Sequence, residues 1–222
     1  MRTVVRPEWV EEAPPARHPG RSVPPADGKP GGVPIEVVGL LALTSSALYF
    51  VSDLIEVMQG RFSTGQLWLT LVAEATIPIS VIGLWLVQRP WLGRLGAASA
   101  ITYAYSFVFF SGTVAFALVD GTRDFERLGE ALGPWMTVHG AAMVAAGVGF
   151  GYAVSRARVL PPWTGIALSV GVVLIPLSIA LADVVGLIGI GLRDLAFAGM
   201  GVALMGGRRL FANAPPERPN RR

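Results

Sequence analysis

The stretch IGIGLRDLAFAGMGVALMGG, residues 188–207, has the apolar character of a membrane-spanning helix but carries Arg193 and Asp194 inside it. About 20 consecutive apolar residues are enough for a helix to cross the hydrocarbon core of a bilayer. A charged side chain at that depth is costly unless it is paired or hydrated, and it often marks a functional site. The two charges therefore raise the question of what surrounds them.

The composition of the whole chain indicates a membrane protein. Hydrophobic residues make up 52% of the 222 residues and charged residues 15%, whereas soluble domains carry about 25% charged residues. The chain has no cysteine, which excludes disulfides and thiolate chemistry. Its net charge of +3 is small and does not indicate nucleic-acid binding. Lys29 is the only lysine, and such a preference for arginine is typical of bacteria with GC-rich genomes.

Six apolar segments of membrane-spanning length follow one another along the chain. They cover residues 35–58, 66–87, 95–119, 134–154, 163–182 and 186–205. Residues 1–33 form a polar tail rich in proline and glycine, which we expect to be disordered, and residues 207–222 form a basic tail. The sequence thus predicts an all-α integral membrane protein, a six-transmembrane-helix bundle within residues 34–206.

Basic residues determine the predicted orientation, because cytoplasmic loops of membrane proteins are enriched in Lys and Arg. If both termini are cytoplasmic, both tails are basic and the inner loops contain Arg89, Arg94, Arg156 and Arg158. The outer loops then contain only Arg61, Arg123 and Arg127. We therefore expect a multi-pass protein of the inner, or plasma, membrane with its N- and C-termini in the cytoplasm.

The third loop, residues 120–133, is an outer loop and differs from the other loops. Phe125, Leu128 and Leu132 occur in it at helical spacing among charged residues. This pattern predicts a short amphipathic helix that lies on the outer surface of the membrane.

The ionisable residues of the membrane segments share one depth in this topology. Counting 1.5 Å per residue from the outer ends of the segments places them in the outer half of the bundle. They are Asp53, Glu56, Glu74, His139, Asp183, Arg193 and Asp194. This set predicts a polar site that opens toward the outer face. The alternative interpretation is a closed ionic lock that fixes how the helices pack.

Pairing within this set follows from helix geometry. Neighbouring residues on a helix point about 100° apart, so we expect Arg193 and Asp194 not to pair with each other. Glu74 is the expected partner of Arg193, because the two are the deepest charges of their segments. Asp53 or His139 is the expected partner of Asp194.

The residue inventory excludes several kinds of membrane chemistry. A retinal Schiff base needs an intramembrane lysine, bis-histidine haem needs two membrane histidines, and a catalytic zinc site usually has at least two His or Cys ligands. The membrane segments contain one histidine, His139, and no lysine. We expect no metal and no cofactor, which leaves the acid–base chemistry of carboxylates and imidazole.

A carboxylic acid buried in a membrane can keep its proton near neutral pH and donate it to an apolar substrate. The candidate catalytic residues are Glu74, His139 and Asp194, and Glu74 is the leading acid–base group. The candidate substrate-binding residues are Arg193, Asp53, Glu56, Tyr103 and Tyr105, because arginine can orient an anion and aromatic rings can stabilise a cation. The predicted function is that of a small membrane enzyme or binder acting on a lipid-like molecule, isoprenoid or amphipathic.

Two other functions stay open, so the sequence does not decide whether the protein is an enzyme. The carboxylates could carry protons coupled to the transport of a small solute, or the protein could be a non-catalytic accessory or sensor protein with a buried ionic lock. The expected partner is a membrane lipid or a lipid-like small molecule. The tails could bind a cytoplasmic partner, and small-residue faces on the fourth and sixth segments leave open a homo-oligomer.

Overall fold

The computed structural model describes residues 34–206, and both predicted tails, 1–33 and 207–222, lie outside the described residues. All regular structure in the described range is helical. The helices are α1 (Ile35–Gln59), α2 (Thr64–Asp120), α3 (Phe125–Leu132), α4 (Pro134–Ala157), α5 (Pro162–Leu177) and α6 (Asp183–Met205). α2 consists of two arms, Thr64–Arg89 and Trp91–Asp120, so the chain has one helix for each predicted membrane segment and one for the third loop.

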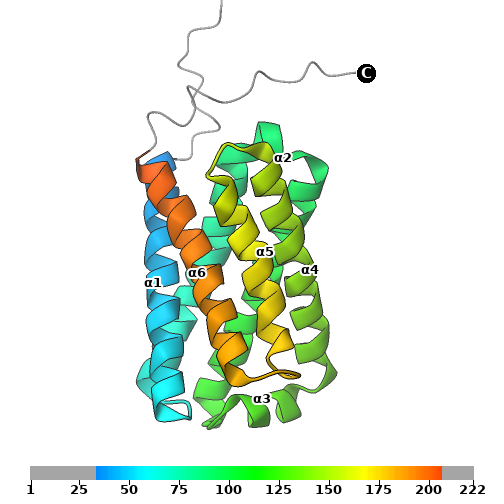
Figure 1. Ribbon diagram of the computed structural model, residues 1–222. Helices are drawn as coiled ribbons and strands as arrows, with labels where there is room; N and C mark the ends of the chain where they lie inside the picture. The colour runs from blue at the N-terminus through cyan, green and yellow to red at the C-terminus, as the bar shows by residue number, and fades with distance from the viewer. Residues whose placement is uncertain (1–33, 207–222) are drawn as a thin grey trace, which may run out of the picture.

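Five helices in residues 34–206 are long and apolar enough to cross a membrane: α1, both arms of α2, α4 and α6. α5 is also apolar but has only 16 residues. The protein is therefore a multi-pass membrane protein with a helical bundle. The start of α1 and the end of α6 lie at the same end of this bundle, and α3 lies at the opposite end, which we call the α3 end (Figure 1).

The chain reverses its direction near the junction of the two arms of α2, and Gly93, close to that junction, has a non-helical backbone conformation. Gly93 has φ 63° and ψ −167°, a backbone conformation that is essentially restricted to glycine. The sequence pattern suggests a loop over residues 88–94. In the structure the helical hydrogen bonding continues almost up to the reversal, because one glycine is sufficient to make the turn.

α5 ends earlier than the sequence pattern predicts. The predicted segment covers residues 163–182, but the helix ends at Leu177 and residues 178–182 form a turn before α6 begins. Pro176 lies in the last turn and has no backbone N–H to donate, which favours the end of the helix there. With 1.5 Å per residue α5 is about 24 Å long, shorter than a hydrocarbon core of about 30 Å.

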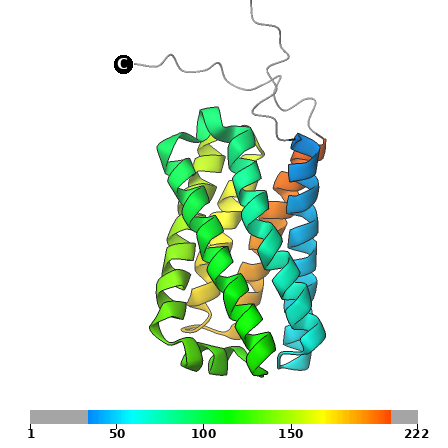
Figure 2. The same ribbon diagram turned by 180° about the vertical axis from the view of Figure 1, so that it is seen from behind.

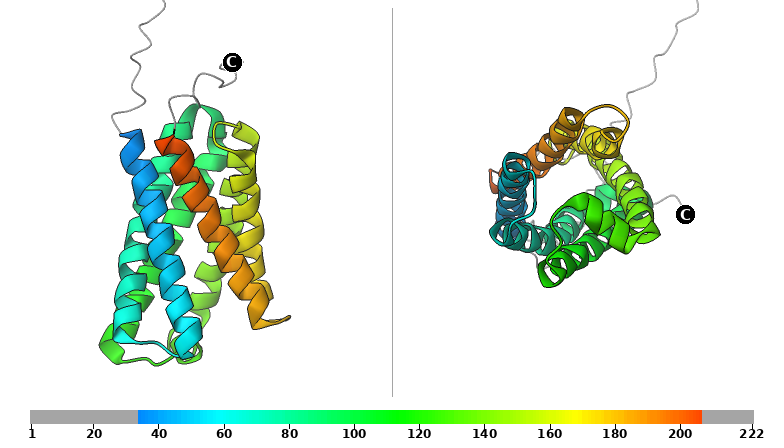
Figure 3. Two further views of the ribbon diagram at one scale, coloured as in Figure 1. Left: turned by 60° about the vertical axis from the view of Figure 1, so that its left-hand side comes forward. Right: turned by 90° about the horizontal axis from the view of Figure 1, so that it is seen from below.

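α1, the two arms of α2, α4, α5 and α6 form a ring in which neighbours in the ring pack against each other (Figure 2, Figure 3). α1 packs against α2 and α6, α4 packs against α2 and α5, and α5 packs against α6. This arrangement places α1 between the first arm of α2 and α6, and those three helices carry most of the buried charges.

Aromatic side chains fill the interior of the ring. The ring centroids of Tyr49 and Phe107 are 6.4 Å apart, those of Tyr103 and Phe107 are 5.1 Å apart, and those of Tyr103 and Phe197 are 6.1 Å apart. Tyr103 and Phe107 are completely buried. The space between the ribbons in Figure 3 is therefore occupied by side chains from α1, the second arm of α2 and α6.

The amphipathic helix predicted in the third loop is confirmed as α3. A side-chain oxygen of Asp124 accepts a hydrogen bond from the backbone N–H of Arg127 at 2.9 Å and caps the first turn. Leu128 is buried in a small cluster with Leu67 and Ala117, whereas Phe125 is exposed. α3 therefore packs against one end of the bundle with its apolar face.

Candidate functional site

The structure brings together Arg193, Asp194, Asp53 and Glu74, which come from α6, α1 and the first arm of α2. Glu74 lies about 15 Å from the start of α2, and Arg193 lies about 15 Å from the start of α6. Both residues therefore lie several helical turns inside apolar helices of membrane-spanning length. Arg193, Asp194 and Glu74 are buried, with exposed fractions of 4%, 5% and 4%. We call these four residues the charged cluster.

The guanidinium of Arg193 donates hydrogen bonds to two carboxylates. Nε donates to Asp194 Oδ1 at 2.9 Å, and Nη2 donates to Asp53 Oδ2 at 3.4 Å. The prediction that Arg193 and Asp194 do not pair is therefore wrong. The Cα–Cβ bonds of the two residues diverge, but the long arginine side chain folds back so that its Nε reaches the neighbouring carboxylate.

Tyr49 lies between Arg193 and Glu74. Its hydroxyl donates to Glu74 Oε1 at 2.8 Å, and the Cζ atom of Arg193 lies 4.2 Å from the centroid of its ring. A cation over an aromatic face is stabilised by about 0.5–2 kcal/mol. The predicted direct pair of Arg193 and Glu74 is thus wrong, because the Tyr49 side chain occupies the position between the two charges.

Carboxyl groups outnumber cations in this cluster. Asp53, Asp194 and Glu74 surround Arg193, which is the only buried Lys or Arg side chain in residues 34–206. Ionised carboxylates without a matching cation cost several kcal/mol each in a membrane interior. The cluster can therefore approach neutrality only by taking up protons or another cation.

Three buried oxygen atoms at this place have no hydrogen-bond partner within the described part of the chain. They are Glu74 Oε2, Asp194 Oδ2 and the hydroxyl of Tyr103. Tyr103, from the second arm of α2, is close enough to Arg193 and Asp194 to interact electrostatically with both. A buried polar atom without a partner costs about 1–3 kcal/mol, and native proteins contain few of them. Such atoms therefore indicate a position with a role beyond packing.

Polar side chains also connect Glu74 to the α3 end, along the contact between α1 and the first arm of α2. The two helices are antiparallel, and three cross-helix pairs follow one another. Gln66 Nε2 donates to Glu56 Oε2 at 3.2 Å, Ser52 Oγ lies 2.5 Å from Thr70 Oγ1, and Tyr49 donates to Glu74. Gln66 Nε2 also lies 3.0 Å from Thr70 Oγ1 and joins the first pair to the second. We call these six residues the polar seam.

Beyond Glu74, toward the other end of the bundle, the contact between α1 and α2 becomes apolar. The buried apolar side chains there are Val38, Ala42, Ile77, Val81 and Leu84. Buried serines occur among them, but each hydroxyl donates to a carbonyl of its own helix. These bonds run from Ser45 to Leu41, from Ser46 to Ala42 and from Ser80 to Thr76. The polar seam therefore leads from Glu74 in one direction only.

Sequence analysis missed four residues of the seam: Tyr49, Ser52, Gln66 and Thr70. A signal for them was present in the sequence. Gln66, Thr70 and Glu74 are spaced by four residues, which places them on one face of an otherwise apolar helix. Polar residues at the matching spacing on α1 complete the pattern. Glu56, a predicted site residue, is half-buried and belongs to the seam rather than to the charged cluster.

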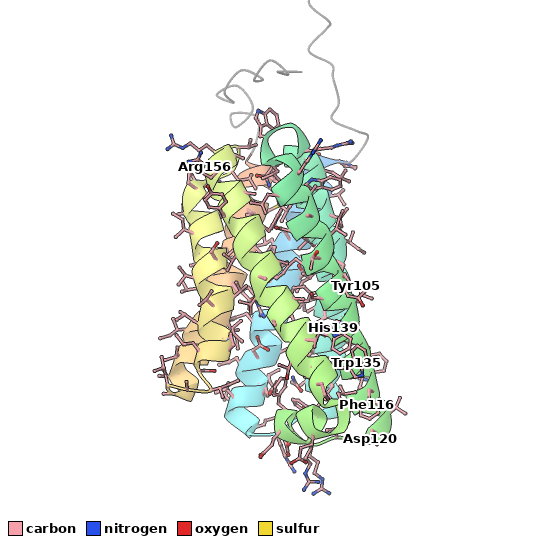
Figure 4. The ribbon with its side chains drawn as sticks, turned by 90° about the vertical axis from the view of Figure 1, so that its right-hand side faces the viewer. Tyr105, Phe116, Asp120, Trp135, His139 and Arg156 are labelled. Carbon is pink, nitrogen blue, oxygen red and sulfur yellow. The ribbon has the colours of Figure 1, made fainter. Side chains whose placement is uncertain are left out.

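His139 lies apart from the charged cluster, on the side of α4 that packs against the second arm of α2 (Figure 4). Its Nδ1 is 2.9 Å from the backbone oxygen of Trp135, which can only accept a hydrogen bond. Nδ1 therefore carries the hydrogen, and Nε2 accepts from the hydroxyl of Tyr105 at 3.4 Å. The imidazole also stacks on Phe109, with ring centroids 3.6 Å apart. The expected pairing of Asp194 with Asp53 or His139 is not formed. Asp53 and Asp194 both pair with Arg193, whereas His139 bonds to Tyr105 and Trp135.

The two candidate substrate-binding tyrosines lie in different environments. Tyr103 is completely buried in the interior of the ring, whereas Tyr105 is 60% exposed on its outside. Residues two positions apart on a helix point in nearly opposite directions, about 200° apart. The aromatic residues of the second arm of α2 therefore do not form one wall around a substrate.

Two cavities in the described part of the chain lie at the loop between α1 and α2. One of them is lined by Gln59, Arg61, Phe62, Ser63 and Thr64. Neither is lined by a residue of the charged cluster, whose side chains are packed by their neighbours. The structure shows the charged side chains of the predicted polar site buried or largely buried. In residues 34–206 no group of three or more His, Asp or Glu side chains is placed to hold a metal ion.

Comparison of this chain with protein-family models, with characterised proteins and with solved structures found no match. The function therefore has to be inferred from the chemistry of the charged cluster and of the polar seam.

Proposed function

We propose that the protein binds and releases a proton in its membrane core and acts as a proton-sensing or proton-coupled membrane protein, with Glu74 as the group that carries the proton. The observation that carries this proposal is the excess of carboxyl groups around Arg193. A proton on Glu74 converts its carboxylate to a carboxylic acid and removes one uncompensated charge from the interior of the helix bundle. Asp53 and Asp194 keep their bonds to Arg193 in both states.

Glu74 is better suited to this role than the two aspartates. Both aspartates bond directly to the guanidinium, whereas Glu74 meets it only through Tyr49. Glu74 Oε1 accepts from Tyr49, and Oε2 has no donor within residues 34–206, so Oε2 is the atom that can carry the hydrogen. The titratable and charged side chains near Glu74 are Tyr49 and Asp53 from α1 and Arg193 from α6. Asp194 lies on the other side of Arg193, to which it bonds.

Protonation of Glu74 would change the contact between helices. A hydrogen bond to a charged acceptor contributes about 1.5–3 kcal/mol, and one to a neutral acceptor contributes about 0.5–1.5 kcal/mol. The Tyr49–Glu74 bond is the cross-helix bond in question, so a proton on Glu74 weakens the attachment of α1 to α2. Tyr49 also lies under Arg193, so the change extends to α6. This is how proton binding would be converted into a change of helix packing.

The proposal is tested by infrared difference spectroscopy of the protein in lipid nanodiscs during a pH titration. Wild type should show the C=O band of a carboxylic acid that appears as the pH falls and that is absent in Glu74→Gln. Glu36→Gln is the matched control, since Glu36 is an exposed glutamate of α1, and it should keep the band. A titrating band of the same size in Glu74→Gln would overturn the proposal.

A second function, acid–base chemistry on an isoprenoid or amphipathic lipid-like molecule, is favoured by one specific observation. The hydroxyl of the exposed residue Tyr105 bonds to the Nε2 atom of the buried His139, so an acid and a base lie together at the edge of the ring. Native mass spectrometry of protein extracted from its own membrane tests this. A stoichiometric ligand should be lost in Tyr105→Phe and kept in Tyr152→Phe, an exposed tyrosine of α4. A protein without any bound ligand would exclude this function.

A further inference from the structure

We infer that protons reach Glu74 from the α3 end alone, along the polar seam, so that the protein responds to the pH of one side of the membrane. This inference rests on the proposed function of Glu74 and adds to it the route and the side of access. It assigns a role to Glu56, Gln66, Ser52 and Thr70, none of which belongs to the charged cluster.

The entrance of the route lies at the end of α1. Glu56 is half-buried in the last turn of that helix, and its Oε2 accepts from Gln66. The cavity lined by Gln59, Ser63 and their neighbours lies in the adjoining loop. Ser63 accepts a hydrogen bond from the backbone N–H of Gln66, which ties that loop to the first polar pair. Glu56 is therefore the carboxylate that a proton from the α3 side meets first.

The middle of the route consists of groups that both donate and accept hydrogen bonds. Ser52 and Thr70 are hydroxyls in mutual contact, and a hydroxyl can accept a proton on one lone pair while it gives up its own hydrogen. Gln66 is 2% exposed, and its Oε1 has no partner within residues 34–206. A buried acceptor of this kind between polar neighbours is where proteins bind an internal water molecule. Thr70 then lies one helical turn, about 6 Å, from Glu74, a distance that one water molecule bridges.

The proton balance of the transfer is simple. The proton enters on the Glu56 carboxylate, passes through the hydroxyls and bound water by successive exchange of O–H hydrogens, and ends on Glu74 Oε2. No bond between heavy atoms forms or breaks, and no electron is transferred. After the transfer each hydroxyl again carries one hydrogen. This hydrogen is the one that it received from the preceding group of the route.

The route is closed on the other side of Glu74. Ile77, Val81 and Leu84 separate Glu74 from the opposite end, and the buried serines near them bond to their own helix. The aromatic contacts of Tyr49 with Phe107 and of Phe107 with Tyr103 fill the interior of the ring at the same level. A proton that arrives at Glu74 therefore leaves by the way it came, and the protein does not conduct protons across the membrane.

The experiment uses the full chain in liposomes of uniform orientation and follows the carboxylic acid band of Glu74 after light-driven release of protons on one side. Protons released on the α3 side should produce the band, and protons released on the other side should not. Thr70→Val should slow the appearance of the band about tenfold or more without changing its final size. Thr76→Val is the matched control and should keep the wild-type rate. Both threonine hydroxyls bond to a carbonyl of their own helix, at Gln66 for Thr70 and at Val72 for Thr76, but the Thr70 hydroxyl also contacts Ser52 across the helix contact.

The outcomes separate the two proposals. Equal access from both sides, or an unchanged rate in Thr70→Val, overturns the one-sided route while Glu74 remains the proton carrier. Absence of the band under every condition overturns the proposed function itself. Gln66→Leu provides a second test of the route if Thr70→Val does not fold, and the same slowing is expected in it.

Discussion

At the scale of single residues, one guanidinium is shared by several side chains. Arg193 bonds to Asp194 and Asp53 and lies on the ring of Tyr49, whose hydroxyl reaches Glu74. Every carboxyl group of the charged cluster therefore depends on the same cation, directly or through Tyr49. Removal of Arg193 would leave these groups buried without compensation.

Arg193→Gln should lower the free energy of unfolding by about 3–5 kcal/mol, the usual cost of leaving a buried charge unpaired. Thermal unfolding in detergent, followed by circular dichroism, measures the effect. Arg127→Gln is the control, because Arg127 forms an exposed pair with Asp124, and pairs of that kind contribute little. Equal unfolding temperatures for the two variants would show that the cluster is not held by Arg193.

Tyr49→Phe removes the hydrogen bond to Glu74 and keeps the ring beneath Arg193. The variant should be less stable than wild type by about 1–3 kcal/mol at high pH, where Glu74 is ionised, and by less at low pH, where Glu74 carries the proton. The loss of stability is larger at high pH because the ionised carboxylate of Glu74 forms a stronger hydrogen bond with Tyr49 than the protonated carboxylic acid does. Urea unfolding at two pH values, with Tyr152→Phe as the exposed control, measures the difference. A loss of unfolding free energy in Tyr49→Phe that does not depend on pH would contradict the proton-carrying role of Glu74.

At the scale of elements, α5 and α6 approach each other closely at the level of the charged cluster. A Cβ atom on Gly171 would lie 2.7 Å from the backbone nitrogen of Arg193 and 2.7 Å from the backbone oxygen of Gly189. Glycine at this position therefore lets the backbone of α5 touch α6 beside Arg193. The contact holds the part of α6 from which the guanidinium reaches α1.

Gly171→Ala should force α5 and α6 apart and destabilise the protein by about 1–3 kcal/mol, as overpacking of a tight contact does. It should also weaken the carboxylic acid band of Glu74, because Arg193 is displaced. Gly191→Ala is the control on α6, since no atom lies within 4 Å of its added Cβ. Both variants are compared by thermal unfolding and infrared spectroscopy. Similar losses in Gly171→Ala and Gly191→Ala would show that the close approach is unimportant.

The helices themselves could largely be predicted from the sequence, because each needs about 20 apolar residues to cross the membrane. The boundaries that were missed depend on single residues. Gly93 allows the arms of α2 to reverse without a longer loop, and Pro176 ends α5 early. The pairing of charges could not be predicted, because it depends on the register between helices and on the path of a long arginine side chain. Tyr49 is an example, because its contacts with Glu74 and Arg193 follow from the way α1 lies against α2 and α6.

At the scale of the whole molecule, the position of the α3 end decides what the protein responds to. Asp120 and Arg156 lie at opposite ends of the bundle (Figure 4). The excess of arginine in the loops of the Arg156 end predicts that this end is cytoplasmic and that the α3 end faces outward. The proposed proton route would then open to the outside of the cell.

The orientation can be measured by cysteine labelling, because the chain has no native cysteine. Arg127→Cys should react with a membrane-impermeant maleimide added to intact cells. Arg156→Cys should react only after the cells are permeabilised. The reverse pattern would place the α3 end in the cytoplasm and would change the side on which the protein responds to pH.

Proton binding by Glu74 in the interior of the helix bundle can be measured by an isotope-edited infrared pH titration of the unmodified chain. Protein produced with ¹³C-labelled glutamate should show a titrating carboxylic acid band that moves to lower frequency with the label, because the proton is on a buried glutamate. A titrating band that does not move would assign the proton to an aspartate. The absence of any titrating band would leave the charged cluster with a purely structural role and contradict the account.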